Sequence, residues 1–198
     1  MSKLSKKKVI GITGSMGAGK SQVSKRIQEF YPVIDCDEVN RNLMKKNEQG
    51  YNALISLPFV RLDQDKEIDK AYLSSQMFQY KEIKKEVEEI LHPLIFSKIK
   101  EWIDVQDSCL VFVEMPLLFE INAQSFFDSI WCVTCSKEVA LDRLQTYRHI
   151  PKEEAICRWN HQMSPKEKIA KSTYVIENNT DLLALYKRVD VLIERECA

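Results

Sequence analysis

Glycine is scarce in this chain, and almost all of it lies in one short segment. The 198 residues contain five glycines, and four of them fall between Gly11 and Gly19. Glycine lets the backbone adopt left-handed angles, and it lets a ligand approach where a side chain would block it. A chain that otherwise avoids glycine therefore needs unusual backbone freedom, or a very close ligand contact, at this one place.

The glycine-rich segment contains the complete pattern G-x-x-x-x-G-K-[ST] as Gly14–Ser21 (GSMGAGKS). An apolar run, Lys8–Thr13, precedes it and is typical of a buried parallel strand, while Gly19–Phe30 follows with helical spacing of its apolar residues. A strand, this loop and then a helix is the context that the pattern requires. Backbone N–H groups of such a loop wrap a phosphate, and the helix directs its positive end toward the same anion.

The loop therefore predicts a nucleotide site. We expect Lys20 to reach the β- and γ-phosphates and the Ser21 hydroxyl to ligate Mg²⁺. The nucleotide-binding residues expected from this segment are Gly14, Gly17, Ala18, Gly19, Lys20, Ser21 and Gln22.

The rest of the chain alternates between apolar runs and helical patterns. The expected strands are Val33–Asp35, Cys109–Met115, Ile130–Cys135 and Thr173–Ile176, and the expected helices are Glu38–Lys46, Lys137–Tyr147, Pro151–Gln162 and Asp181–Arg195. This alternation predicts an α/β fold, in which helices cover both faces of a parallel sheet. We expect one compact domain over residues 1–198, with a core of residues 8–37 and 109–198 and a helical insert of about residues 38–103.

Within the insert, three local sequence features predict specific structural details. Gly50 should interrupt the helix that precedes it, and Asp69 should cap a helix that runs through Phe78. Apolar residues at helical spacing predict a buried stripe, formed by Ile83, Val87, Ile90 and Leu94.

Charge and cysteine usage exclude several classes of protein. The chain has 29 basic and 29 acidic residues, so a broad polybasic surface for nucleic acid or membrane is not expected. No apolar run is long enough to span a bilayer, and the basic segment Met1–Lys8 lacks the features of a signal peptide. With no second Cys-x-x-Cys pair, Cys132 and Cys135 are interpreted as structural, and a reducing cytoplasm is expected.

The shortage of later glycines also narrows the class of phosphate-loop protein. A GTPase needs an Asp-x-x-Gly switch, but the only later glycine, Gly50, has no aspartate three residues before it. The Ser-Gly-Gly signature of transporter ATPases and the glycine-rich substrate loop of shikimate-type kinases are also absent. Adenylate-type kinases usually carry proline inside the loop, where this chain has Met16. The remaining class is a kinase that acts on a small molecule.

Two carboxylates, Asp35 and Asp37, directly follow the second expected strand. The carboxyl ends of parallel strands surround the ligand crevice, and alternate strand residues point the same way. One carboxylate can accept a proton from an attacking hydroxyl, and the other can hold Mg²⁺ or its waters. The alternative is a solvated turn in which an aspartate caps the next helix.

Basic residues gather between the fourth and fifth expected strands, namely Arg143, Arg148, Arg158, Lys166 and Lys168. They can form a lid of about residues 143–170 that closes over the phosphates, or they can be ordinary solvated helix faces. The interleaved acidic residues leave both interpretations open for the set, whereas for Arg143 a functional role is favoured.

Taken together, these segments resemble the dephospho-CoA kinase family, over about Ile10–Val191. The resemblance is carried by Ile10–Ser21 (IGITGSMGAGKS), Val33–Asp37 (VIDCD) with Arg41, Ile90–Pro93 (ILHP), Glu114–Glu120 (EMPLLFE), Arg143-Leu144, Arg158 with Gln162, and Val175–Asn178 (VIEN). It implies a phosphate-loop kinase fold with a five-stranded parallel sheet in the order 2-3-1-4-5, a CoA-binding insert and a lid. The implied reaction transfers the γ-phosphoryl group of ATP to the ribose 3′-hydroxyl of dephospho-CoA, the last step of CoA synthesis.

The resemblance also implies roles for individual residues. Asp37 becomes the proposed base, with Lys20 and Arg143 as the other catalytic residues. The substrate residues are Asp37, Arg41, His92, Pro116 and Leu117, and Arg148 and Asn178 join the nucleotide site. Ser21 and Asp35 are assigned to the metal. ATP and dephospho-CoA are the expected partners of a cytoplasmic monomer or weak homo-oligomer, with no nucleic acid and no membrane.

The lid departs from the family's pattern at one position. The family usually has a second arginine four residues after the first, whereas this chain has Tyr147 there and Arg148 one step later. Since Pro151 follows, we expect the helix to end by about His149 and Arg148 to turn back toward the nucleotide in the closed state. Another metabolite kinase, or a nucleotide-binding module without turnover, remains the alternative function.

Overall fold

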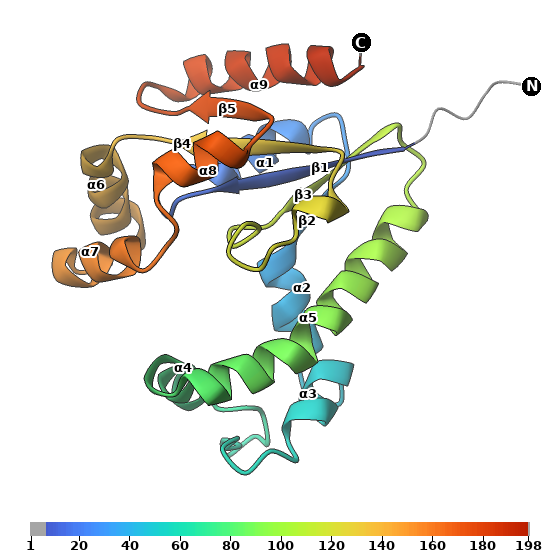
Figure 1. Cartoon of the computed structure of the whole chain (residues 1–198), viewed down its shortest axis with the longest axis vertical. Coiled ribbons are helices and arrows are strands. Elements are labelled where there is room, and N and C mark those ends of the chain that lie inside the picture. The colour runs from blue at the N-terminus through green and yellow to red at the C-terminus, as the bar shows by residue number, and fades with distance from the viewer. Residues whose placement is uncertain (1–6, 198) are drawn as a thin grey trace, which may run out of the picture. The chain divides into compact units, whose positions relative to one another are not determined.

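Five apolar segments form one parallel sheet, in the order β2-β3-β1-β4-β5 (Figure 1). The structure is a computed structural model, and it describes residues 7–197. The strands are β1 (Lys8–Gly14), β2 (Val33–Asp35), β3 (Leu110–Glu114), β4 (Ser129–Thr134) and β5 (Tyr174–Glu177). The expected α/β class and the expected strand order are both confirmed.

The central strand β1 determines where the functional loops lie. Every residue from Ile10 to Gly14 is buried, so both faces of the strand are covered, as in other parallel sheets. In the parallel register, Ile12 pairs with Glu114 of β3, and Gly14 pairs with Val133 of β4. The carboxyl ends of these three strands therefore lie at the same edge of the sheet, where ligands bind in open α/β folds.

The helices that accompany this sheet are α1 (Lys20–Ile27), α6 (Lys137–Arg148), α7 (Lys152–Asn160), α8 (Pro165–Lys171) and α9 (Leu182–Cys197), together with a short 3₁₀ helix, η1 (Gln124–Phe126). Helices α1 and α9 pack against each other and share one hydrophobic core with β1 and β4. Figure 1 shows α9 running alongside β5. Helix α8 was not among the predicted helices, although Ser164 and Glu167 form a capping box with Pro165 at the first helical position.

The chain divides into two compact units. The first contains the residues up to Val33 and from Gln106 onward, and the second is Ile34–Val105. The helices of the second unit are α2 (Cys36–Leu43), α3 (Gln49–Leu54), α4 (Lys70–Gln79) and α5 (Lys81–Asp104). Helices α2, α3 and α4 each pack against α5, which buries the apolar face of the longest helix.

Three details of the second unit differ from the sequence expectations or refine them. Gly50 does not interrupt a helix but lies inside α3. Glycine is needed at this position because a Cβ would come within 2.8 Å of the Leu43 carbonyl oxygen. The cap by Asp69 is confirmed, since its side chain accepts from the Tyr72 backbone N–H. The buried stripe of α5 is rotated from the expected one and consists of Val87, Leu91, Ile95, Ile99 and Ile103.

The predictions about the cysteine pair and about membrane-spanning segments concern residues that the structure largely describes. Burial raises the pKa of the Cys132 and Cys135 thiols, which agrees with a structural role for this pair. No helix within residues 7–197 combines the length and the apolar character that crossing a bilayer demands. Residues 1–6, which contain most of the segment considered for a signal peptide, lie outside the described residues.

The buried carboxylate of Glu196 bonds helix α9 to the sheet. Glu196 of α9 accepts from Ser129 Oγ at 2.5 Å and from Trp131 Nε1 at 2.8 Å, and Lys8 Nζ lies 2.6 Å from its other oxygen. Burial by itself would raise the pKa of Glu196, but the hydrogen bonds from Lys8, Ser129 and Trp131 outweigh it and hold the pKa below its usual value. The last turn of the chain is thus bonded to both β1 and β4.

We expect Glu196→Gln to lower the free energy of unfolding by about 2 kcal/mol at pH 7, because a hydrogen-bonded charge is lost. The folded-state pKa of Glu196 is lowered, so its contribution is complete above the unfolded-state pKa and disappears as the pH falls through the folded value. Urea denaturation at pH 7 and pH 3 should show the difference between the two proteins shrinking in acid. Glu194→Gln, on the exposed face of α9, is the control. An equal deficit at both pH values would contradict this account.

Candidate active site

The loop after β1 has the backbone geometry of a phosphate-binding loop. Gly14 and Gly19 have positive φ angles of 144° and 95°, and a Cβ at Gly14 would lie 2.1 Å from the Val133 carbonyl oxygen. At the crest of the loop, Ala18 N–H donates to the Ser15 carbonyl at 3.2 Å and closes a tight turn. A side chain at Gly14 would thus collide with β4, which is why the sheet-facing glycine is required.

Lys20 and the helix start both concentrate positive charge at this loop. Lys20 Nζ donates to the carbonyls of Gly14 and Ser15, at 3.0 and 3.1 Å, so the ammonium group lies across the mouth of the loop. Lys20 is also the first residue of α1, whose N-cap Gly19 supplies no side-chain cap. The positive end of the α1 dipole therefore lies at this loop.

A cavity of about 430 Å³ opens beside the loop in the first unit. It is lined by Gly17, Gly19, Ser21, Gln22, Arg143, Leu144, Tyr147, Asn178, Thr180, Asp181, Leu182 and Leu185. Backbone and hydroxyl groups of the loop form one wall, and leucines of α6 and α9 form another, with Tyr147 beside them. A volume of this size with one polar and one apolar wall suits a nucleotide, whose phosphates and base need different surroundings.

Asn178, which directly follows β5, joins the loop to Arg143. Its buried side chain donates from Nδ2 to the Ala18 carbonyl at 2.9 Å, while Arg143 donates to the Asn178 carbonyl at 3.0 Å and to Oδ1 at 3.4 Å. A Cβ at Gly19 would lie 2.3 Å from Asn178 Nδ2. The structure therefore brings together the loop, Arg143 and Asn178.

The other basic residues of the expected lid have different surroundings. Helix α6 ends at Arg148 with His149 in a left-handed conformation, φ 53°, which confirms the predicted helix end. Arg148 is exposed and outside the cavity lining, so its contact with the nucleotide stays a prediction. Arg158 pairs with Glu154 on an exposed helix face. Lys168 is not a lid residue at the surface, because it is fully buried.

Lys168 is instead the centre of a polar network beneath the loop. Its ammonium group lies 2.8 Å from Glu120 Oε1 and donates to the Pro116 carbonyl at 2.9 Å. Thr13 Oγ1, from the end of β1, donates to the same carbonyl at 3.1 Å. Pro116 is thus fixed by its backbone, while the neighbouring Leu117 is exposed. This structural role of Lys168 was not predicted, since a buried lysine has the same local sequence pattern as a solvated one.

Glu114 is a further residue near the loop that the sequence analysis did not single out. It ends β3, next to β1, and accepts a hydrogen bond from Ser24 Oγ of α1 at 2.5 Å. The sequence signal for Glu114 was its place as an acidic residue at the end of an otherwise apolar strand.

The remaining predicted residues belong to the second unit. Asp35 is the N-cap of α2, and its Oδ1 accepts from the backbone N–H groups of Asp37 (2.8 Å) and Glu38 (3.4 Å). Asp37 lies in the first turn of α2 with an exposed side chain, so the expected strand alternation of the two carboxylates does not apply. Arg41 follows one turn later on α2, and His92 lies on α5, against which α2 packs.

Comparison with known proteins identifies the family. Residues 8–184 match the family model described as dephospho-CoA kinase. The chain belongs to the dephospho-CoA kinase family. A dephospho-CoA kinase from Listeria innocua is 35% identical over 195 residues, covering 95% of this chain and 96% of its own length.

Two solved structures of similar proteins agree with this membership of the dephospho-CoA kinase family. The protein TT1252 from Thermus thermophilus has a TM-score of 0.85 at 27% identity, covering 96% of this chain and 98% of its own. A dephospho-CoA kinase from Campylobacter jejuni has a TM-score of 0.69 at 26% identity, covering 94% and 95%. Both matches therefore include the second unit of this chain as well as the first.

We expect Gly19→Ala to weaken nucleotide binding at least tenfold. The new methyl group would displace Asn178 and would place alanine in a left-handed conformation. Gly50→Ala is the control, because its Cβ would also be crowded, by the Leu43 carbonyl oxygen at 2.8 Å, but it lies in the second unit. Titration with ATP, alongside thermal unfolding, should show a binding defect for Gly19→Ala and only a stability defect for Gly50→Ala. Unchanged ATP affinity in Gly19→Ala would contradict this assignment.

Proposed function

We propose that the protein uses the cavity beside Gly14–Ser21 to hold ATP and transfers its γ-phosphoryl group to the ribose 3′-hydroxyl of dephospho-CoA. Membership of the dephospho-CoA kinase family supports this reaction, which completes CoA biosynthesis. The observation that carries the proposal is the phosphate loop itself, where backbone donors, Lys20 and a nucleotide-sized cavity form one site. The acceptor oxygen forms a bond to the γ-phosphorus while the bond to the β-phosphate oxygen breaks, and ADP leaves.

Catalysis of this step by the first unit is mainly electrostatic. Negative charge shifts toward the β–γ bridging oxygen as the bond breaks, and loop N–H groups and Lys20 face the place where it develops. Arg143 is held to the loop through Asn178, so a second cation is fixed near the same phosphates without a loss of side-chain freedom on binding. We propose that Arg148 adds a further contact when the lid, about residues 143–170, closes, while its later part around Lys168 stays bonded to the loop after β3.

The donor set beside the loop fits Mg²⁺. The exposed Ser21 hydroxyl lines the cavity, and hydroxyl and carboxylate oxygens are the ligands that Mg²⁺ prefers. Mg²⁺ is usually bound by one or two protein oxygens plus substrate phosphates, and when bound it would neutralise phosphate charge. We propose Ser21 as its ligand. Asp35 remains the second candidate, although two backbone N–H groups already bond to its Oδ1.

We propose that the second unit, Ile34–Val105, supplies part of the acceptor side of the reaction. Its exposed Asp37 has the chemistry of a general base, and it would take the proton of the 3′-hydroxyl as the new O–P bond forms. Arg41, His92, Pro116 and Leu117 are proposed to bind dephospho-CoA. The proposed setting is the cytoplasm, with the protein acting as a monomer or weak homo-oligomer.

The reaction is tested by measuring ADP formation with dephospho-CoA against a panel of nucleosides and other metabolites. We expect turnover with dephospho-CoA and loss of roughly a thousandfold in Lys20→Met, because the charge opposite the phosphates is gone. Lys25→Met, exposed on the same helix, is the control and should keep its activity. ATP turnover with another acceptor would favour the second candidate, a different metabolite kinase, and Lys20→Met activity within tenfold of the parent would remove the loop from the mechanism.

Two isosteric substitutions distinguish the role of Asp35 from that of Asp37. Asp37→Asn should lower kcat by about two to four orders of magnitude, the usual contribution of a general base, while ATP affinity stays unchanged. Asp35→Asn removes the charge but keeps an oxygen that can cap α2, so the fold should persist. Steady-state kinetics and ATP titration of both variants provide the measurement. If Asp35→Asn is far more damaging to kcat than Asp37→Asn, the two roles are reversed.

A further inference from the structure

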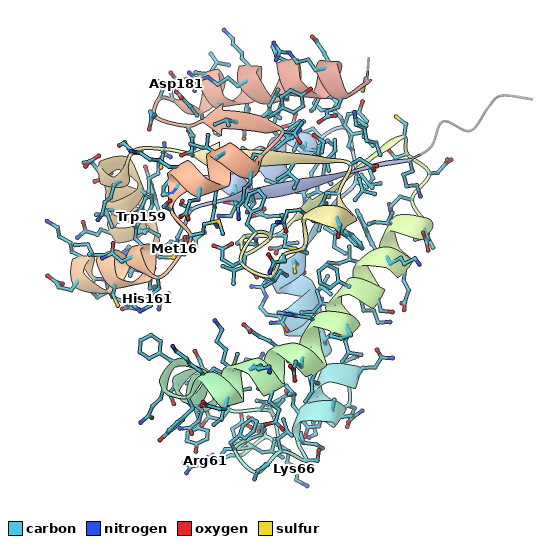
Figure 2. The ribbon with its side chains drawn as sticks, viewed as in Figure 1. Met16, Arg61, Lys66, Trp159, His161 and Asp181 are labelled. Carbon is cyan, nitrogen blue, oxygen red and sulfur yellow. The ribbon has the colours of Figure 1, made fainter. Side chains whose placement is uncertain are left out.

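A side chain from the segment between α7 and α8 reaches back to the phosphate loop. Gln162 Oε1 accepts a hydrogen bond from the Met16 backbone N–H at 3.0 Å, although the two residues are 146 positions apart. Both are partly buried and lie in the first unit. Figure 2 shows Met16 beside the end of α7, where Trp159 and His161 are labelled.

The position of Met16 within the loop explains why this contact matters. The turn at the crest runs from Ser15 to Ala18, closed by the Ala18 N–H, and Met16 is its second residue. An N–H group at this corner needs an acceptor, because an unpaired donor in a partly buried place costs free energy. Gln162 supplies the acceptor, so the corner of the turn is fixed from outside the loop and the following N–H groups are held in one arrangement.

Hydrogen bonds hold the chain next to Gln162 in place. The next residue, Met163, donates its backbone N–H to Glu120 Oε1 at 3.2 Å. That carboxylate is held by the fully buried Lys168, which also donates to the Pro116 carbonyl. The segment between α7 and α8 is therefore bonded to the loop that follows β3, and through Pro116 to Thr13 at the end of β1. This network fixes the backbone directly after Gln162 relative to β1 and to the loop after β3.

We propose that Gln162 is a positioning residue for the nucleotide site, which orders the phosphate loop before ATP binds. Without it, the loop samples other conformations, and ATP has to order the loop at a cost to its affinity. Once ATP is bound, the loop has the same shape with or without Gln162, so the chemical step changes little. The expected change in KM rests on the proposed kinase function, whereas the expected change in the ATP dissociation constant requires only that the protein binds ATP.

The test compares Gln162→Met, which removes the acceptor at similar length, with Gln145→Met on the exposed face of α6. We expect the ATP dissociation constant and the KM for ATP to rise roughly tenfold in Gln162→Met, with kcat within about threefold. The KM for dephospho-CoA and the unfolding temperature should match those of Gln145→Met. An unchanged ATP dissociation constant, or an equal fall in stability and kcat, would overturn the proposal.

A double-mutant cycle isolates the hydrogen bond. Met16→Pro removes the N–H donor, at a loop where adenylate-type kinases usually carry proline. In that background Gln162→Met should have no further effect on ATP affinity, because no donor remains for the glutamine to accept. An undiminished tenfold effect in the proline background would show that Gln162 acts through another contact, and the proposal would fail.

Hydrogen exchange gives a readout that does not depend on Met16→Pro folding or on any kinase activity. The Met16 amide should exchange much faster in Gln162→Met, while core amides such as that of Ile12 keep their protection. Equal protection of the Met16 amide in both proteins would overturn the proposal. A protein without turnover on dephospho-CoA that still shows the ATP and exchange effects would contradict only the proposed function.

Discussion

The close contact between the phosphate loop and its neighbours is the constraint on which the nucleotide site depends. Gly14 lies against the Val133 carbonyl of β4, and Gly19 lies against the Asn178 side chain that follows β5. Neither position has room for a Cβ, so the loop takes its shape from the sheet edge on which it sits. Because the loop binds phosphate through fixed N–H directions, a loop shaped in this way is preorganised for charge stabilisation.

Buried polar groups connect the elements that carry the site. Lys168 and Glu120 join α8 to the loop after β3, Asn178 joins β5 to the phosphate loop, and Glu196 joins α9 to β1 and β4. Each of these groups costs desolvation, which its hydrogen bonds offset, although Glu120 Oε2 is buried without a hydrogen-bond partner among the described residues. Such groups add less to net stability than apolar contacts do, but they fix the directions in which backbone and side-chain donors point.

Elements with a strong local signal were predictable from the sequence. The strand–loop–helix start, the cap by Asp69 and the end of α6 near His149 each depend on residues within a few positions of one another. Errors arose where a distant partner decides the outcome. The buried stripe of α5 is set by which helices pack on it, and Gly50 is required by the Leu43 carbonyl rather than by a helix end. Helix α8 shows a different error, because its capping box was present in the sequence and was overlooked.

The sequence by itself determined the α/β class, the phosphate loop and the family, because these rest on spacing and residue type along the chain. Only the tertiary structure decided that Lys168 is a buried ion-pair partner, that Asp35 caps a helix, and that Gln162 meets Met16. Lysine, aspartate and glutamine carry the same pattern in a sequence whether they face solvent, a helix end or a loop 146 residues away. Their roles follow from which donor or acceptor the packed sheet and helices bring within hydrogen-bond distance.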